Sequence, residues 1–148
     1  MLFRSDVVCS FETIEHLDEP ARLVAEAARV LRPEGTFIAS TPRVEATTRS
    51  PANPHHRIEL SSADFEDLLR EKFDRVRLYG QRRRQTARHR RAQRLDVLGL
   101  RRRLPVLRRV SATLLGTAPL EALTADDIEI EEDALDGATE VIAVCSRR

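Results

Sequence analysis

The sequence has no apolar run of 18 or more residues, and this absence excludes a transmembrane helix of ordinary length. Its N-terminus also lacks the basic, apolar and small-residue pattern of a secretory signal peptide. We therefore expect a cytoplasmic protein. The 148 residues allow one domain at most, and 41% of them are hydrophobic, which is enough for a real core.

Aromatic residues and glycines are both scarce. Only 4% of the residues are aromatic, so we expect an aliphatic core. None lies within residues 82–138, which argues against stacking of single-stranded bases on that segment. The five glycines include no Gly-x-Gly, so the chain lacks the turn that lets a backbone approach a nucleotide cofactor.

The net charge of +1 hides a strong asymmetry. Residues 82–109 contain twelve arginines and one acid, Asp96, whereas residues 121–137 contain eight acids and no base. Residues 82–115 are expected to form one or two basic amphipathic helices. The run Arg82–Arg109 could bind phosphates of nucleic acid or anionic lipid, or cover an acceptor site as a lid. The favoured interpretation is a solvated face that pairs with the acidic segment.

Hydrophobic patterning predicts a strand, a helix and a second strand near the N-terminus. Residues 6–10 form a short apolar run, which we interpret as a strand buried on both faces. Asp18, just before Pro20, is a suitable N-cap for a helix whose apolar stripe continues to Leu31. Residues 36–40 then form a strand parallel to the first, with a right-handed crossover.

The pattern is less regular after that strand. Residues 43–60 are polar and contain prolines, so we expect a long loop at the carboxyl end of the second strand. Ser61 or Ser62 is predicted to cap the next helix. A half-exposed strand follows around residues 76–78, and residues 139–145 form the last buried strand.

The stretch Asp6–Leu17 changes abruptly from apolar to polar residues. Glu12, Glu15 and His16 stand at positions i, i+3 and i+4, so one helical turn would place all three on one face. An apolar strand that delivers polar groups at its carboxyl end is how open α/β sheets build active sites. The alternative is an ordinary buried strand followed by a solvated turn.

Several segments of the chain resemble class I S-adenosylmethionine-dependent methyltransferases. The Glu-x-x-Glu-His pattern of Glu12–His16 is similar to one branch, which includes quinone-biosynthesis O-methyltransferases, bacterial enzymes with glycan-related substrates and small-RNA 2′-O-methyltransferases. The resemblance continues through Leu31–Pro42, where the family often has glycine at the position of Glu34, and through Asn53–Glu59 and Phe73–Gln81.

This resemblance implies an α/β fold, a Rossmann-like class I methyltransferase three-layer sandwich. The family's glycine turn and ribose-binding acid lie upstream of the strand that opens this chain. We therefore expect the chain to be the C-terminal part of the domain, with about four strands, and to be inactive alone. The implied activity is O-methylation of a small molecule or glycan. The alternatives are RNA ribose 2′-O-methylation and a non-catalytic module that binds anionic partners.

The resemblance also implies a cofactor site at the end of the first strand. In the family, the segment that matches Ser10, Phe11 and Glu12 lies beside the methionine part of S-adenosylmethionine. For Phe11 the alternative is a plain core residue.

The same resemblance implies a divalent metal held by Glu12, Glu15, His16 and His56, as in the small-RNA enzymes. Two carboxylates with two imidazoles suit Mn²⁺, Zn²⁺ or Fe²⁺ better than Mg²⁺. The metal would grip the hydroxyl to be methylated and lower its pKa. Without a metal, His56 or His16 would act as general base. The catalytic residues are therefore expected to be His56, Glu15 and His16.

The loop that carries His56 contains its own supporting residues. Asn53 and Pro54 are expected to fix the direction of the loop, and Glu59 to orient the His56 ring. His56 should then meet Glu12 or Glu15, because both loops leave the same end of the sheet.

We expect residues 1–148 to form a single partial methyltransferase domain. Residues 1–5 resemble no element and are expected to be a non-native start, and residues 82–138 to be a basic helical insertion followed by an acidic segment. Cys9 and Cys145 fall on strands that the family's order separates by one strand. Two strand spacings come to roughly 9.5 Å, whereas disulfide-bonded Cα atoms lie within about 7 Å, so no disulfide is expected.

Overall fold

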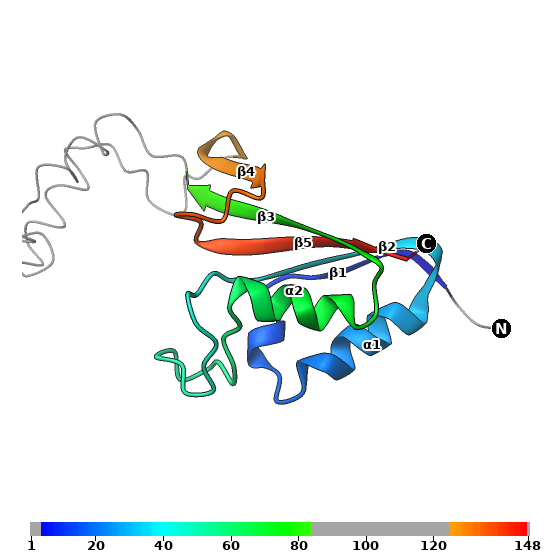
Figure 1. Ribbon diagram of the computed structural model, residues 1–148, viewed down its shortest axis with the longest axis horizontal. Helices are drawn as coiled ribbons and strands as arrows, with labels where there is room; N and C mark the ends of the chain where they lie inside the picture. The colour runs from blue at the N-terminus through cyan, green and yellow to red at the C-terminus, as the bar shows by residue number, and fades with distance from the viewer. Residues whose placement is uncertain (1–3, 84–124, 148) are drawn as a thin grey trace, which may run out of the picture. The chain divides into compact units, whose positions relative to one another are not determined.

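The computed structural model describes residues 4–83 and 125–147 (Figure 1). The chain divides into two compact units, the first made of residues 1–82 and 130–148 and the second of residues 83–129. The first unit contains the two α-helices of the described residues and the candidate site. Of the second unit the structure describes Arg83 and residues 125–129.

The predictions for the arginine-rich segment lie mostly outside the described residues, since the basic helices of 82–115 and the arginines from Arg84 to Arg109 fall there. At the start of the segment, Arg82 Nη2 donates to Glu131 Oε2 at 2.6 Å. The phosphate-binding, lid and solvated-face interpretations of the segment all stay predictions. At the other end of the chain, Ser5 already belongs to the first strand and Arg4 donates to the Leu31 carbonyl.

The chain forms a mixed sheet with strands in the order β1-β2-β5-β3-β4. β1 and β2 are parallel, and β5 is antiparallel to both β2 and β3. An α/β fold of the Rossmann-like class is thereby confirmed. The elements are β1 (Ser5–Ser10), η1 (Ile14–His16), α1 (Pro20–Val30), β2 (Leu31–Pro42), α2 (Ser62–Arg70), β3 (Arg75–Arg83), η3 (Ala125–Asp127), β4 (Ile128–Glu132) and β5 (Glu140–Ser146).

The two helices α1 and α2 lie on the same side of the sheet (Figure 1). Phe37 of β2 pairs in register with Val8 of β1 and with Cys145 of β5. Because paired residues of neighbouring strands point to the same side, these three side chains lie on the face that the helices cover. The prediction that β1 is buried on both faces was wrong. Val7 is 52% exposed, because it points to the face that these helices leave open.

The turn from α1 into β2 is tighter than the sequence suggested. Leu31, expected at the end of the helix, has extended dihedrals (φ −68°, ψ 140°) and begins β2. Glu34 has a positive φ of 65°, a conformation that glycine adopts at less cost, which accounts for the glycine that the family often has there. A Cβ on the following Gly35 would meet the Arg32 carbonyl oxygen at 2.9 Å. Close backbone approach thus explains why residue 35 is glycine.

The two α-helices begin differently. The N-cap of α1 is Glu19 with no side-chain hydrogen bond, so the predicted cap at Asp18 was wrong, and Pro20 at the first helical position fixes the start instead. The cap of α2 is confirmed, since Ser61 Oγ accepts from the Asp64 backbone N–H at 3.2 Å.

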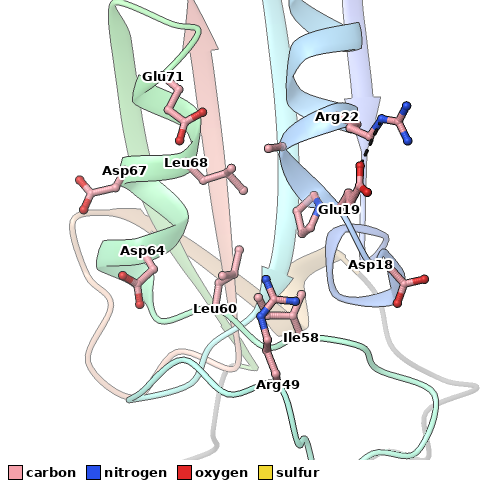
Figure 2. A pocket seen from close by; sticks show the side chains of 12 residues that line it. Asp18, Glu19, Arg22, Arg49, Ile58, Leu60, Asp64, Asp67, Leu68 and Glu71 are labelled. Atoms are coloured by element: carbon pink, nitrogen blue, oxygen red, sulfur yellow. Dashed lines mark ion pairs between the residues drawn. The ribbon is translucent and has the colours of Figure 1, made fainter.

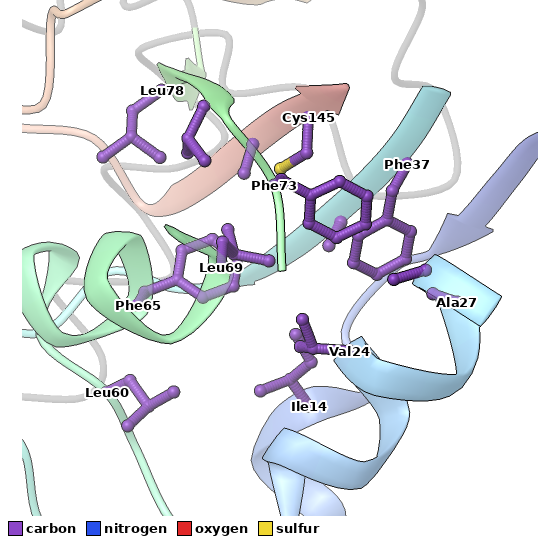
Figure 3. Close-up of a cluster of buried hydrophobic side chains, with 14 of the residues drawn as sticks. Ile14, Val24, Ala27, Phe37, Leu60, Phe65, Leu69, Phe73, Leu78 and Cys145 are labelled. Carbon is purple, nitrogen blue, oxygen red and sulfur yellow. The ribbon is translucent and has the colours of Figure 1, made fainter. Parts of the chain in front are cut away.

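The core lies between the sheet and the two helices (Figure 3). Phe37 stacks on Phe73 with ring centroids 5.6 Å apart, and Phe65 is fully buried beside Leu69. Most of the other core residues are aliphatic, as predicted, and these three phenylalanines are its aromatic members in the described part of the chain. Cys9 and Cys145 are free thiols on strands separated by β2, which confirms the absence of a disulfide.

Residues 43–60 form the expected long loop at the carboxyl end of β2, and it folds back on itself. Thr48 and Glu59 exchange backbone hydrogen bonds of 2.9 Å, and Val44 bridges to Ser61. Among the described helices, none is long and apolar enough to span a bilayer.

Candidate functional site

The candidate site lies where β1 and β2 reach their carboxyl ends. The loops that follow two neighbouring parallel strands leave the sheet at the same edge. The segment after Ser10 and the loop after Pro42 therefore meet. Glu15 joins them directly, since its backbone carbonyl accepts hydrogen bonds from the N–H groups of Arg57 (2.7 Å) and Ile58 (3.2 Å).

Glu12 does not share a helical turn with Glu15 and His16. Its φ of 48° breaks the helical path, and the short helix η1 begins only at Ile14. Its carboxylate accepts from Ser40 Oγ at 2.7 Å, and its backbone N–H donates to the same hydroxyl at 3.1 Å. The expectation that one turn groups the three residues was wrong, because Ser40 at the end of β2 holds Glu12 apart.

Glu15 is a buried carboxyl group, with its side chain 1% exposed. One of its oxygens, Oε2, has no hydrogen-bond partner among the residues that the structure describes. Burial raises the pKa of Glu15 above its ordinary value, and the nearby charge of Glu12 adds to the shift. A buried carboxyl with a free oxygen is well suited to hold a cation or a polar ligand.

His16 has its ring orientation set by the loop. Its Nδ1 lies 2.9 Å from the His55 carbonyl oxygen, and a carbonyl can only accept, so Nδ1 carries the hydrogen. In the neutral ring Nε2 then has the free lone pair. That atom lies 3.9 Å from Glu15 Oε1, and the side chain is 42% exposed.

His56 has hydrogen-bond partners on both ring nitrogens. Its Nδ1 lies 2.6 Å from Glu59 Oε1, the contact that the sequence suggested, and its Nε2 lies 2.8 Å from Asn53 Nδ2. The His16 and His56 rings meet edge to face, with centroids 5.0 Å apart.

Glu15, His16 and His56 converge on one point. One possible ligand atom from each lies within 4.8 Å of the others, and Glu12 is outside this group. We call these three residues the acid–histidine cluster. Tetrahedral ligands at about 2.1 Å from a metal are about 3.4 Å apart, so the side chains must draw together slightly to share a cation. The unpartnered Glu15 oxygen and the Nε2 lone pair of His16 fit such an ion.

The residues expected beside the cofactor lie at the end of β1. Ser10 is 9% exposed, and its hydroxyl has no partner within the described part of the chain. Phe11 is 55% exposed, so the alternative that it belongs to the core was wrong.

Sequence reasoning missed two partners. Ser40 could have been found from the parallel register, because it follows Ala39, which pairs with Ser10. His55 acts through its backbone, whose carbonyl holds His16, and no side-chain pattern could signal that role.

A separate cavity of about 490 Å³ lies between the beginnings of α1 and α2 (Figure 2). Its apolar wall and much of its acidic rim come from Ile58, Leu60, Leu68, Asp64, Asp67 and Glu71. Since Ile58 follows His56 by two residues, the cavity shares the loop of the acid–histidine cluster. Arg22 and Arg49 also line it, so its rim carries charges of both signs.

Comparison with known proteins identifies relatives. Residues 4–39 match the family model of a methyltransferase domain. Over 67 residues the chain is 45% identical to a Mycolicibacterium smegmatis protein named "Probable S-adenosylmethionine-dependent methyltransferase", a match that covers 43% of this chain and 26% of that protein. A Mycobacterium tuberculosis protein of the same name is 43% identical over 67 residues, which cover 43% of this chain and 24% of that protein. The match thus spans about a quarter of the length of these relatives.

Among solved structures, the fold resembles that of a SAM-dependent methyltransferase from Thermotoga maritima, with a TM-score of 0.58 and 14% identity. The likeness covers 97% of this chain and 56% of the Thermotoga chain. At this identity it shows the fold alone. The chain is thus similar to S-adenosylmethionine-dependent methyltransferases in the segment 4–39, in the 67 residues shared with the mycobacterial relatives and in its fold.

Proposed function

We propose that the protein transfers a methyl group from S-adenosylmethionine to a hydroxyl oxygen of a small molecule or glycan. The observation that carries this proposal is the convergence of Glu15, His16 and His56 at the carboxyl ends of β1 and β2. Two imidazoles and a carboxyl group are the means of binding and deprotonating a hydroxyl.

The reaction needs a base because a neutral hydroxyl is a weak nucleophile. The acceptor oxygen attacks the methyl carbon, the carbon–sulfur bond breaks, and its electron pair stays on sulfur to give S-adenosylhomocysteine. The hydroxyl proton must pass to a nearby base. His56 Nε2 can receive it once the hydroxyl takes the place of Asn53 Nδ2, because Glu59 on Nδ1 leaves the lone pair of the neutral ring on Nε2. Glu15 and His16 would hold the hydroxyl beside that nitrogen.

A divalent cation is a second way to prepare the hydroxyl. Glu15, His16 and His56 would hold it, and their nitrogen and oxygen donors suit Mn²⁺, Zn²⁺ or Fe²⁺. When bound, such a cation lowers the pKa of a hydroxyl and orients it. Glu12, 2.7 Å from the Ser40 hydroxyl, would instead stay on the cofactor side with Ser10 and Phe11.

The experiment measures transfer of a labelled methyl group by the protein expressed from the whole open reading frame that encodes this chain. Acceptors are a panel of hydroxylated small molecules, glycans and RNA oligonucleotides. We expect His56→Ala to lower kcat by about 10²–10⁴-fold. His55→Ala is the matched control, because that side chain is exposed and only its backbone makes hydrogen bonds. Absence of transfer to every hydroxyl would refute the proposal.

The same assay separates the two mechanisms. If a metal prepares the hydroxyl, a chelator should abolish activity and Glu15→Ala should be severe. If His56 acts as a general base without metal, activity should survive the chelator and Glu15→Ala should be milder. Transfer to the RNA oligonucleotides alone would replace the small-molecule proposal by ribose 2′-O-methylation.

A non-catalytic role in binding anionic partners is favoured by the twelve arginines of residues 82–109. Affinity for RNA or anionic vesicles should then fall steeply with salt. Charge reversal of Arg101, Arg102 and Arg103 should weaken it. Absence of binding to both ligands at low salt would remove this role.

A further inference from the structure

The orientation of the Asn53 side chain follows from its contacts. The backbone N–H of His55 donates to Asn53 Oδ1 at 3.1 Å, and of the two polar atoms of the side-chain amide only the oxygen can accept. The amide nitrogen of Asn53 is therefore the atom that faces His56 Nε2 at 2.8 Å. Since an amide N–H₂ group can only donate, Nε2 accepts.

The other ring nitrogen of His56, Nδ1, is a hydrogen-bond donor. The Glu59 carboxylate accepts from Nδ1 at 2.6 Å, so the neutral ring carries its hydrogen on Nδ1 and its lone pair on Nε2. His56 is 12% exposed and Glu59 17%, so both are largely shielded from water. The lone pair that a hydroxyl or a cation requires is thus already used by Asn53.

We propose that Asn53 is a positioning residue that caps His56 Nε2 in the resting protein and is displaced when a hydroxyl or a cation binds there. This inference rests on the proposed function, since it assumes that His56 works through Nε2. Asn53 holds the ring in the tautomer and direction that the reaction needs, and it keeps the lone pair from other donors.

The hydrogen bond from Asn53 Nδ2 can be removed while the turn around Asn53 keeps its other hydrogen bonds. The Asn53 backbone carbonyl accepts from the His56 N–H at 3.1 Å, and Oδ1 accepts from the His55 N–H. Neither bond uses the amide nitrogen. His16 also fastens the turn through the His55 carbonyl at 2.9 Å. Loss of the bond from Nδ2 therefore leaves the loop anchored to η1.

A single hydrogen bond between neutral groups is also weak enough to be displaced. Its net worth corresponds to about a two- to tenfold change in an equilibrium constant. Binding of a cation or an acceptor at Nε2 must overcome that factor. Removal of the cap should accordingly expose Nε2 and strengthen ligand binding by a similar factor.

The test uses the 148-residue chain with Asn53→Ser, since a serine hydroxyl can still accept from the N–H two residues on but cannot reach the ring as an amide does. Diethyl pyrocarbonate acylates unprotonated imidazole nitrogens, and peptide mass spectrometry resolves each histidine. We expect acylation of His56 to become about two- to tenfold faster, while His16 stays at its wild-type rate. Ala52→Ser is the matched control and should change neither rate.

An unchanged His56 rate in Asn53→Ser would overturn the proposal. An equal increase at His16 and His56 would also overturn it, because it would mean that the amide only stabilises the loop. Nitrogen-15 NMR gives a second measurement, in which the Nε2 resonance should move toward that of a free lone pair in the variant. A resonance that does not move contradicts the cap.

Titration of the chain with Zn²⁺ then tests the proposed function separately. If the metal mechanism holds, Asn53→Ser should bind Zn²⁺ about two- to tenfold more tightly, and the gain should vanish in a His56→Ala background. Absence of Zn²⁺ binding with faster His56 acylation would refute the metal mechanism and support the cap. Tight binding that Asn53→Ser does not improve would overturn the cap instead.

Discussion

The two faces of the sheet differ sharply in how they are covered. On the helix-covered face, Phe37, Ala39 and Ala143 have no exposed surface. On the other face, Val7 is 52% exposed, and Ile38 is only partly buried although it is adjacent to Phe37. Because adjacent side chains of a strand point to opposite faces, Phe37 lies in the core while the next residue, Ile38, stays partly exposed to water.

The covered face also contains the polar groups of the candidate site. Ser10, Thr41 and Glu15 each have a buried side-chain oxygen without a hydrogen-bond partner among the described residues. Ser10 and Thr41 lie near the carboxyl ends of β1 and β2, and η1 packs against β2. Most of the helix-covered face is apolar, so the free-energy cost of unpaired polar groups is concentrated where ligands are expected.

The largest predicted difference between the faces is in cysteine reactivity. Cys145 on the covered face is fully buried, and burial raises its pKa to about 12. At pH 8 only about one such thiol in 10⁴ is ionised. Cys9 on the other face is exposed. We expect a disulfide reagent to modify Cys145 at least about 10³-fold more slowly than Cys9. Similar rates in the folded protein would contradict the difference, and the rates should converge in denaturant.

A smaller but still large difference is expected for core truncation. Phe37→Ala removes a fully buried ring that stacks on Phe73, and should lower the free energy of unfolding by about 3–5 kcal/mol. Val7→Ala, on the exposed side of β1, should cost less than about 1 kcal/mol. Denaturant titration of both variants checks the comparison. An equal loss of unfolding free energy in the two variants would show that the face of Val7 is as tightly packed as the helix-covered face.

The smallest predicted effect concerns Glu15 and depends on pH. Burial raises the pKa of Glu15 above 4.5, so the folded state binds a proton that the unfolded state releases. Its contribution to stability is therefore fully present below pH 4.5 and is lost as pH rises through the folded-state pKa. Glu15→Gln carries no charge at any pH, so it should remove this loss and be more stable than wild type at pH 7.

Glu26→Gln is the matched control for that measurement. The pKa of Glu26 is lowered by its hydrogen bond from Arg29, so its contribution is lost only as pH falls, and its removal should not stabilise the protein at pH 7. Unfolding curves recorded between pH 4 and pH 8 supply the test. A Glu15→Gln variant that is less stable than wild type at pH 7 would mean that the carboxylate is paired and not merely buried.

Much of the fold followed from local patterns in the sequence. The apolar stripe of α2, its cap at Ser61 and the parallel pairing of β1 with β2 were all predictable, because each depends on residue spacing within one segment or one strand–helix–strand unit. The meeting of the two loops followed from that parallel pairing, and the Glu59–His56 contact was expected from the resemblance of Asn53–Glu59 to the family.

Contacts between distant segments were not predictable from spacing. Ser40 holds Glu12 away from Glu15, although the two glutamates stand at helical spacing. The exposed position of Val7 depends on which face α1 and α2 cover. Asn53 belongs to the same loop as His56, but only the folded turn shows that its amide reaches Nε2.

The sequence by itself therefore determined which residues could carry the chemistry, since the residue types and their order along the strands are local properties. Tertiary structure decided which of them meet. Glu15, His16 and His56 come together because the loop after β2 docks its backbone N–H groups on the Glu15 carbonyl. That docking satisfies polar groups of segments about forty residues apart, and no local spacing encodes a hydrogen bond of that range.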